Sequence, residues 1–190
     1  MFAFCLTSAI GNVSYDKDAI IENCILEMKT GSKESLSKFY ELCKGAIYGF
    51  ALSILKNKQD AEDVLQDVLL KIYNSAEYYK ANGKPMPWVL TITKNFSIMK
   101  IRERQKVSFE TSEEWEKIGF TEDTLDEEDK YFLNDLLSVL SDEERQIVLL
   151  KACAGLKHRD IAKLLDIHLS TCLSKYNRAI KKLQNNCERR

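Results

Sequence analysis

The side chains that could carry out a reaction are spread too thinly in this chain to form a catalytic centre. Its 190 residues include only two histidines and six cysteines, and no Cys-x-x-Cys pair, so metal-ligand spacing is absent. The sequence also contains no phosphate-binding glycine loop, no nucleophile elbow and no paired-carboxylate pocket. We therefore predict a protein that is not an enzyme and needs no metal or cofactor.

The cysteines are better explained by packing than by redox chemistry. Cys43, Cys153 and Cys172 fall within apolar helical patterns, where cysteine behaves as a small hydrophobic residue. We expect these three side chains to be buried in helical cores.

What remains is binding chemistry, and the first pattern of this kind is an acidic row in DAEDVLQDVLLKIY, residues 60–73. Its polar residues recur at steps of three and four, opposite an apolar stripe, so that like charges repel unless a basic partner binds. A charged first turn that complements the helix dipole would explain the early acids but not Asp67. The candidate partner-binding residues are Asp60, Glu62, Asp63, Gln66 and Asp67.

The second pattern is basic and lies in PWVLTITKNFSIMKIRERQK, residues 87–106, together with the loop that precedes it. The helix carries a stripe of lysine and arginine that can neutralise phosphates, and the loop mixes aromatic, amide and basic groups suited to an unpaired base. For Trp88 a core position is favoured over DNA contact, whereas Asn95 could position the loop or touch DNA. The candidate DNA contacts are Tyr79, Lys80, Asn82, Lys84, Lys94, Asn95, Lys100, Arg102 and Arg104.

The third pattern, residues 141–183, reads as three helices separated by two abrupt turns. Ser141 and Glu144 have the spacing of a capping box, and Gly155 ends the first helix. Asp166 occupies the second turn, where glycine is usual, but aspartate tolerates the left-handed conformation. The pattern predicts a helix-turn-helix with a polar, basic reading face, although any compact helical bundle has tight turns and solvated cations. Its candidate DNA contacts are Arg159, Ser170, Thr171, Ser174, Lys175, Arg178 and Lys182.

These patterns belong to an all-α fold class of two small helical domains. Four helices are expected before residue 108, with a break at 81–87 that holds both prolines. We divide the chain into an N-terminal extension (1–16), a helical domain (17–108), an acidic linker (109–130) and a helix-turn-helix domain (131–190).

Charge is segregated along the chain even though the net charge is only -1. The linker holds 10 acidic and 2 basic side chains, and both flanking domains are mildly basic. An acidic segment between two nucleic-acid binders could suppress off-target DNA contacts, or it could simply be solvated. No run approaches the roughly 20 apolar residues of a membrane span, and the first residues are unlike a signal peptide, so we expect a cytoplasmic protein.

Taken in order, the acidic row, the basic helix and the helix-turn-helix resemble regions two and four of the extracytoplasmic-function (ECF) sigma factors, the promoter-recognition subunits of bacterial RNA polymerase. The resemblance covers about residues 18–184. It implies that the acidic row binds the clamp of the core polymerase and that the loop captures a base of the minus-ten element. It further implies that the last helix reads the minus-35 element, that Arg145 and the apolar face beside it dock the polymerase flap, and that an anti-sigma protein is a partner.

One departure from that family is Leu173, which stands where a basic residue is common. It leaves open a sigma-like DNA-binding regulator that does not itself support initiation. A helical protein-interaction module without a nucleic-acid role is a further alternative, suggested by the near-neutral net charge.

Overall fold

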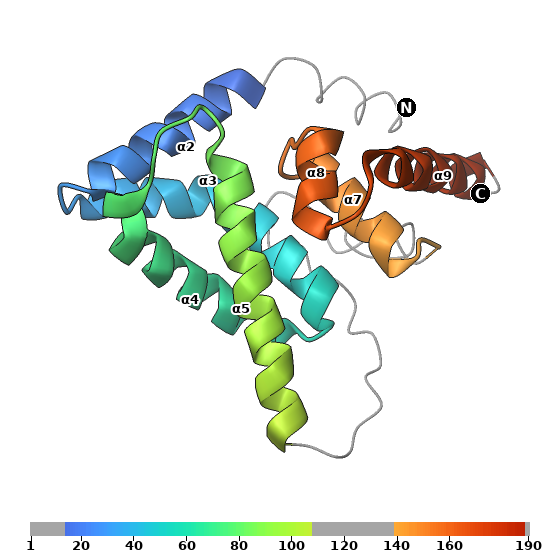
Figure 1. Ribbon diagram of the computed structural model, residues 1–190, viewed down its shortest axis with the longest axis horizontal. Helices are drawn as coiled ribbons and strands as arrows, with labels where there is room; N and C mark the ends of the chain where they lie inside the picture. Colours follow the sequence, from blue (N-terminus) through green and yellow to red (C-terminus); the bar gives the residue numbers. More distant parts are fainter. Residues whose placement is uncertain (1–13, 108–138, 189–190) are drawn as a thin grey trace.

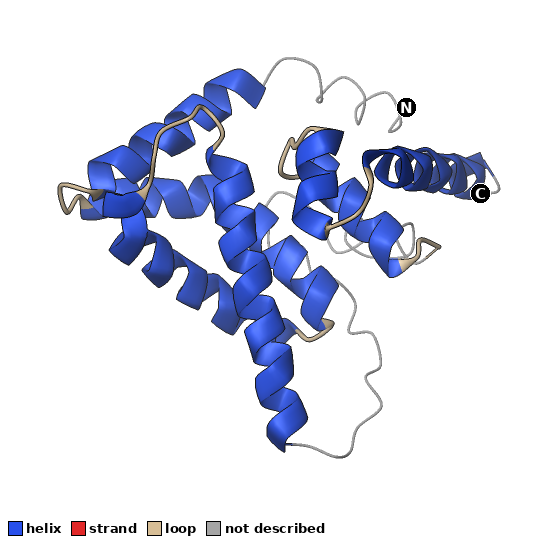
Figure 2. Ribbon diagram, viewed as in Figure 1, coloured by secondary structure: helices blue, strands red, loops and turns tan. Residues whose placement is uncertain are grey.

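The computed structural model describes residues 14–107 and 139–188, and these form seven α-helices and one short 3-10 helix without any strand (Figure 2). The all-α fold class is therefore confirmed. The predicted acidic linker and nearly all of the N-terminal extension lie outside the described residues.

The first four α-helices form an N-terminal module (Figure 1). Ser32 and Asn57 cap the second and third of these helices by accepting hydrogen bonds from the backbone three residues later, and Pro85 opens the fourth. Buried side chains such as Phe39, Ile72 and Leu90, all 0% exposed, fill the space between the helices. The elements are α2 (Ser14–Met28), α3 (Lys33–Leu55), α4 (Lys58–Ser75), η1 (Ala76–Tyr78) and α5 (Pro85–Val107).

The remaining helices, α7 (Asp142–Ala152), α8 (His158–Leu165) and α9 (Leu169–Glu188), form a C-terminal module. The predicted capping box is confirmed: Ser141 N donates to Glu144 at 3.0 Å, and Glu144 N donates to Ser141 Oγ at 3.4 Å. Asp166 adopts the left-handed conformation with φ of 57°, as expected for the turn between α8 and α9. The capping box thus sets the start of α7, and the left-handed Asp166 forms the turn that leads into α9.

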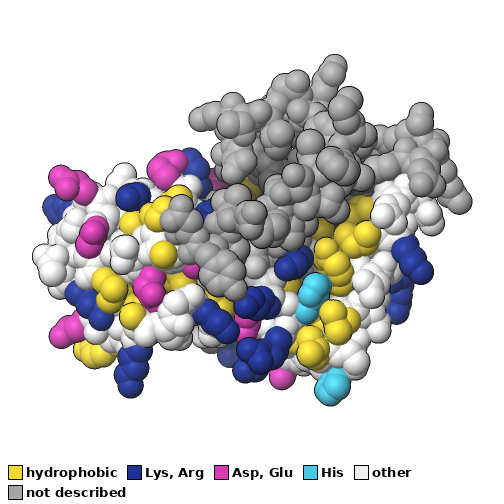
Figure 3. All heavy atoms as spheres, turned by 90° about the horizontal axis from the view of Figure 1, so that it is seen from above, with side chains coloured by type: hydrophobic (Ala, Val, Ile, Leu, Met, Phe, Trp, Pro, Cys, Tyr) yellow, Lys and Arg dark blue, Asp and Glu magenta, His cyan; other side chains and the backbone are white. Residues whose placement is uncertain are grey.

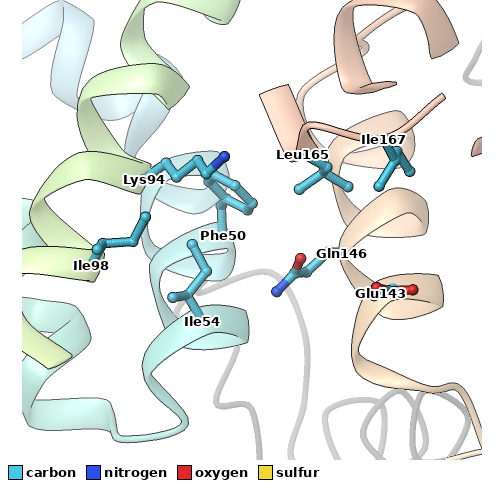
Figure 4. Close-up of a pocket in the computed structure, with 8 residues that line it drawn as sticks. All are labelled: Phe50, Ile54, Lys94, Ile98, Glu143, Gln146, Leu165 and Ile167. Atoms are coloured by element: carbon cyan, nitrogen blue, oxygen red, sulfur yellow. The ribbon is translucent and has the colours of Figure 1, made fainter. Parts of the chain in front are cut away.

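The two modules pack against each other, with α7 beside α3 and α8 beside α5. Polar contacts also cross the boundary: Lys94 Nζ donates to the Leu164 carbonyl at 2.7 Å, Gln146 Nε2 donates to the Ser53 carbonyl at 3.4 Å, and Lys56 pairs with Asp142 at 2.8 Å. A cavity of about 220 Å³ lies at the same boundary. Figure 4 shows the side chains that line it: Phe50, Ile54, Lys94, Ile98, Glu143, Gln146, Leu165 and Ile167.

The structure corrects one of the cysteine predictions. Cys43 and Cys172 are buried as expected, but Cys153 is exposed, because it follows the last residue of α7 rather than facing the core. In the described parts of the chain, no helix has the length and apolar character needed to cross a membrane.

Candidate nucleic-acid interface

The acidic row on α4 is divided between solvent and the neighbouring helix α5. Glu62, Asp63, Gln66 and Asp67 are exposed, whereas Asp60 is partly covered and its Oδ2 forms an ion pair with Arg104 Nε at 3.0 Å. The outer part of the row, around Gln66 and Asp67, is therefore the part that is open to a partner.

Lys100 bridges the two helices from the basic side. Its Nζ lies 2.8 Å from Asp63 Oδ2 and 3.9 Å from Asp60 Oδ1, and the hydrogen bond to Asp63 raises the pKa of the lysine. Because α5 packs along α4, cations predicted to contact DNA form ion pairs with acids predicted to contact a protein partner. Lys100 and Arg104 therefore hold two helices together in this structure.

Lys94 is also engaged within the protein. Its Nζ donates to the carbonyl of Leu164 at the end of α8, so this cation satisfies a backbone acceptor instead of facing solvent. Of the predicted contacts on α5, Asn95 and Arg102 are exposed.

The two adjacent tyrosines before the proline loop have opposite environments. Tyr79, the predicted DNA contact, is 4% exposed, and its ring lies 4.8 Å from the ring of Trp88, which packs on the core as expected. Tyr78 is 79% exposed. The aromatic ring available for stacking is thus Tyr78, and Tyr79 anchors the loop from inside.

Glu22 of α2 organises the loop. One of its carboxylate oxygens, Oε1, accepts the Tyr79 hydroxyl at 2.8 Å and the backbone N–H groups of Asn82 and Gly83 at 2.9 and 3.0 Å. Burial raises the pKa of Glu22, but these hydrogen bonds outweigh it and hold the pKa below 4.5. Burial and the bond to Glu22 raise the pKa of Tyr79. The loop is therefore held at its base while Lys80, Asn82 and Lys84 remain exposed.

Helix α9 presents a polar surface on the side opposite its buried residues. Ser170, Thr171, Ser174 and Arg178 are exposed, and Arg159 is exposed at the start of α8. The Ser170 hydroxyl lies 2.7 Å from His168 Nδ1, which also accepts the Ser170 N–H at the start of the helix. Figure 3 shows hydrophobic, histidine and basic side chains close together on one part of the surface.

The other two predicted cations of α9 are paired with acids of α7. Lys175 binds Glu143, and Lys182 Nζ lies 2.7 Å from Glu144 Oε2. Burial raises the pKa of Glu144, but the bonds from Lys182 and Ser141 more than compensate and keep the pKa below 4.5. These cations stabilise the contact between α7 and α9.

Arg145, which the resemblance assigned to the polymerase flap, is buried. It is 6% exposed, donates to the Leu140 carbonyl at 3.0 Å and pairs with Asp142 at 3.2 Å. Burial lowers the pKa of its guanidinium, and the Asp142 carboxylate opposes that shift.

Comparison with known proteins identifies the family of this chain. Residues 39–107 match the family described as Sigma-70 region 2, and residues 133–183 match Sigma-70, region 4. The ECF RNA polymerase sigma factor SigK of Mycobacterium bovis is 22% identical over 180 residues, covering 91% of this chain and 94% of SigK. This chain is an ECF sigma factor of the sigma-70 family. SigK of Mycolicibacterium vanbaalenii is 24% identical to it over 158 residues, covering 80% of this chain and 81% of that SigK.

Two solved structures share the fold of this sigma factor. RpoE of Bartonella quintana, in complex with the anti-sigma factor NepR, has a TM-score of 0.62 and 23% identity, covering 83% of this chain and 98% of RpoE. CnrH, in complex with the cytosolic domain of CnrY, has a TM-score of 0.59 and 15% identity, covering 89% of this chain and 97% of CnrH. Because both family regions are present, neither the regulator without initiation activity nor the helical interaction module is favoured.

Sequence reasoning missed two residues of this sigma factor. Leu70 is 60% exposed and lies three residues after Asp67, on the open side of α4, where helical spacing could have identified it. Glu22 gave no local signal, because its bond to Tyr79 spans 57 residues of sequence.

Proposed function

We propose that this sigma factor uses three separate surfaces to start transcription, without chemistry of its own. The open side of α4 binds the core polymerase, the loop of residues 78–84 takes up an unpaired promoter base, and α9 with Arg159 binds upstream DNA. From this function we infer a cytoplasmic location, because polymerase and chromosome meet there.

The proposal for α4 depends on one observation, the exposed row of Asp63, Gln66 and Asp67 that leads to Leu70, which is itself 60% exposed. An exposed apolar side chain beside polar groups is typical of the energetic centre of a protein interface. The acids supply the complementary charge for a basic partner and favour one orientation. The partner with this chemistry is the core polymerase, whose binding is a property of the sigma-70 family.

The proposal for the loop combines its fixed base with its exposed rim. Glu22 and Tyr79 hold the backbone, so little ordering remains to be done when a base binds. Tyr78 offers a flat surface for stacking, and Lys80 and Lys84 can attract the phosphates on either side. Because these contacts exist only with an unpaired base, binding favours the open state of the promoter.

The proposal for α9 assigns base edges and phosphates to different residues. Ser170, Thr171 and Ser174 are exposed and can donate to base edges, whereas the exposed Arg178 and Arg159 can bind phosphates. The solved relatives RpoE and CnrH were captured with NepR and CnrY, and we infer an anti-sigma partner for this chain as well.

Five predicted DNA-contacting cations bind other groups of the protein in this structure, and the proposal does not assign them to DNA: Lys94, Lys100, Arg104, Lys175 and Lys182. Lys94 could contact DNA only if α8 moved away from α5.

Run-off transcription with core RNA polymerase tests the proposal. The full chain, mixed with core enzyme and a library of randomised promoter fragments, should produce transcripts that enrich a defined pair of sequence elements. The matched control is core enzyme alone. If the chain binds core enzyme but no fragment yields transcripts, the initiation function is wrong.

A further inference from the structure

Two leucines are partly exposed on α9, at the border of its packed side. Leu169 and Leu173 are each 39% exposed, and they lie four residues apart on one side of the helix. The packed side of α9 is formed by other residues, including Cys172 and Ala179, both 0% exposed. The leucine pair therefore contributes little to the core of the C-terminal module.

The surroundings of this pair indicate the chemistry of its ligand. Ser170 and Ser174, with exposed hydroxyls, follow the two leucines directly in the helix, and α8 and α9 also carry exposed cations at Arg159, Lys163 and Arg178. A ligand matching this surface must be anionic at its edges, polar in its middle and apolar at one or two points. The major groove of DNA has this combination, and its one apolar base-edge group is the C5 methyl of thymine.

We propose that Leu169 and Leu173 select thymine in the upstream promoter element by contact with its methyl group; this rests on the proposed binding of α9 to DNA. The leucine side chains cannot form hydrogen bonds with a guanine edge or neutralise a phosphate, so their contribution is discrimination among bases. The departure at Leu173 therefore changes the preferred sequence of the element, while Arg159 and Arg178 supply the charge.

Replacing thymine by uracil tests the contact, because deoxyuridine lacks only the methyl group and keeps the same pairing. The holoenzyme is assembled from the full chain and core polymerase, and its probe is the promoter fragment enriched by run-off selection. Each upstream thymine is replaced in turn. We expect uracil to weaken binding by roughly three- to fourfold at one or two positions, the effect of removing one buried methyl-sized group.

Variants of the chain link the effect to the leucines. Leu173→Ala should bring the ratio of the affinities for the thymine and uracil duplexes close to one at one position, and Leu169→Ala should do so at another. Leu173→Met should retain the ratio because it keeps an apolar side chain of similar volume. Arg178→Ala should weaken binding to both duplexes equally and leave the ratio unchanged. Thermal unfolding of each variant verifies that the module remains folded.

Three results would overturn the inference. These are equal binding of thymine and uracil at every position, an enriched upstream element without thymine, and a ratio that persists in both alanine variants. In each of these cases initiation itself stands, so the proposed function survives. A chain that yields no transcripts from any fragment removes both proposals.

Discussion

Helices α5 and α9 were both predicted to face DNA, but the neighbouring helices bind different side chains on each. On α5, Lys94, Lys100 and Arg104 are held by acceptors of α8 and α4. On α9, the paired cations Lys175 and Lys182 contact α7, and the hydroxyls of the outer side stay exposed. The comparison shows that the charge available to a ligand depends on the adjacent helix, not on the count of cations in a segment.

The largest effect should come from the open side of α4. Asp67→Lys reverses the charge of an exposed acid beside Leu70, and we expect affinity for core polymerase to fall by about tenfold or more through charge repulsion at the interface. Leu70→Ser should have a similar effect by removing the apolar centre. Pull-down and titration with core enzyme measure both.

Glu34→Lys is the matched control for this charge reversal, because Glu34 is an exposed acid at the start of α3 and lies outside the row on α4. Its affinity for core polymerase should stay near that of the wild type. Equal losses in Asp67→Lys and Glu34→Lys would show that net charge, and not the α4 surface, controls binding.

Tyr78 and Tyr79 provide a pair of neighbouring variants with opposite expectations. Tyr78→Ala should reduce open-complex formation by about tenfold, since stacking of one base on an aromatic ring contributes about 1–3 kcal/mol, and should leave thermal stability unchanged. Tyr79→Phe removes the hydroxyl bonded to Glu22 and should destabilise the fold by about 1 kcal/mol. Permanganate reactivity of the promoter and thermal unfolding distinguish the two.

The opposite result for the two variants would show that the stacking ring is not Tyr78. A loss of open complex in Tyr79→Phe with unchanged stability would mean that the buried tyrosine leaves its site to contact the base.

The helices could be predicted from sequence because their ends follow local rules. The Ser141 and Glu144 capping box and the Asp166 turn each depend on residues within one helical turn, and both were confirmed. The break predicted at 81–87 ends earlier in the structure, because Pro85 already occupies the first helical position of α5.

The availability of the site residues could not be predicted in the same way. Tyr78 and Tyr79 are adjacent in sequence, and the buried tyrosine contacts a carboxylate 57 residues away. Lys100 is paired because α5 lies along α4 in one particular register, which is a property of the tertiary packing. Patterns identify which segments carry binding groups, and packing decides which of those groups are open.

A smaller effect should separate the cations of the two helices. Arg178→Ala should weaken DNA binding a few-fold and reduce the slope of log affinity against log salt by about one, because one phosphate contact is lost. Lys100→Ala should leave the slope unchanged, since that charge is already paired with Asp63. Filter binding at several salt concentrations measures both slopes, and equal flattening would mean that Lys100 exchanges Asp63 for a phosphate.

The smallest effect concerns acid stability of the C-terminal module. The pKa of Glu144 is held below 4.5, so its bonds to Lys182 and Ser141 stabilise the fold above that pH, and this contribution is lost as the pH falls through the lowered value. Glu144→Gln should therefore be less stable than the wild type near pH 7, by about 1 kcal/mol, and should lose less stability on acidification.

Urea unfolding at pH 7 and pH 4 measures the difference, and Glu143→Gln is the control because its side chain is 57% exposed. Solvent screens such a pair and this variant keeps Glu144, so its stability should depend on pH nearly as that of the wild type does. Equal behaviour of the two variants would mean that burial does not distinguish the two acids of α7.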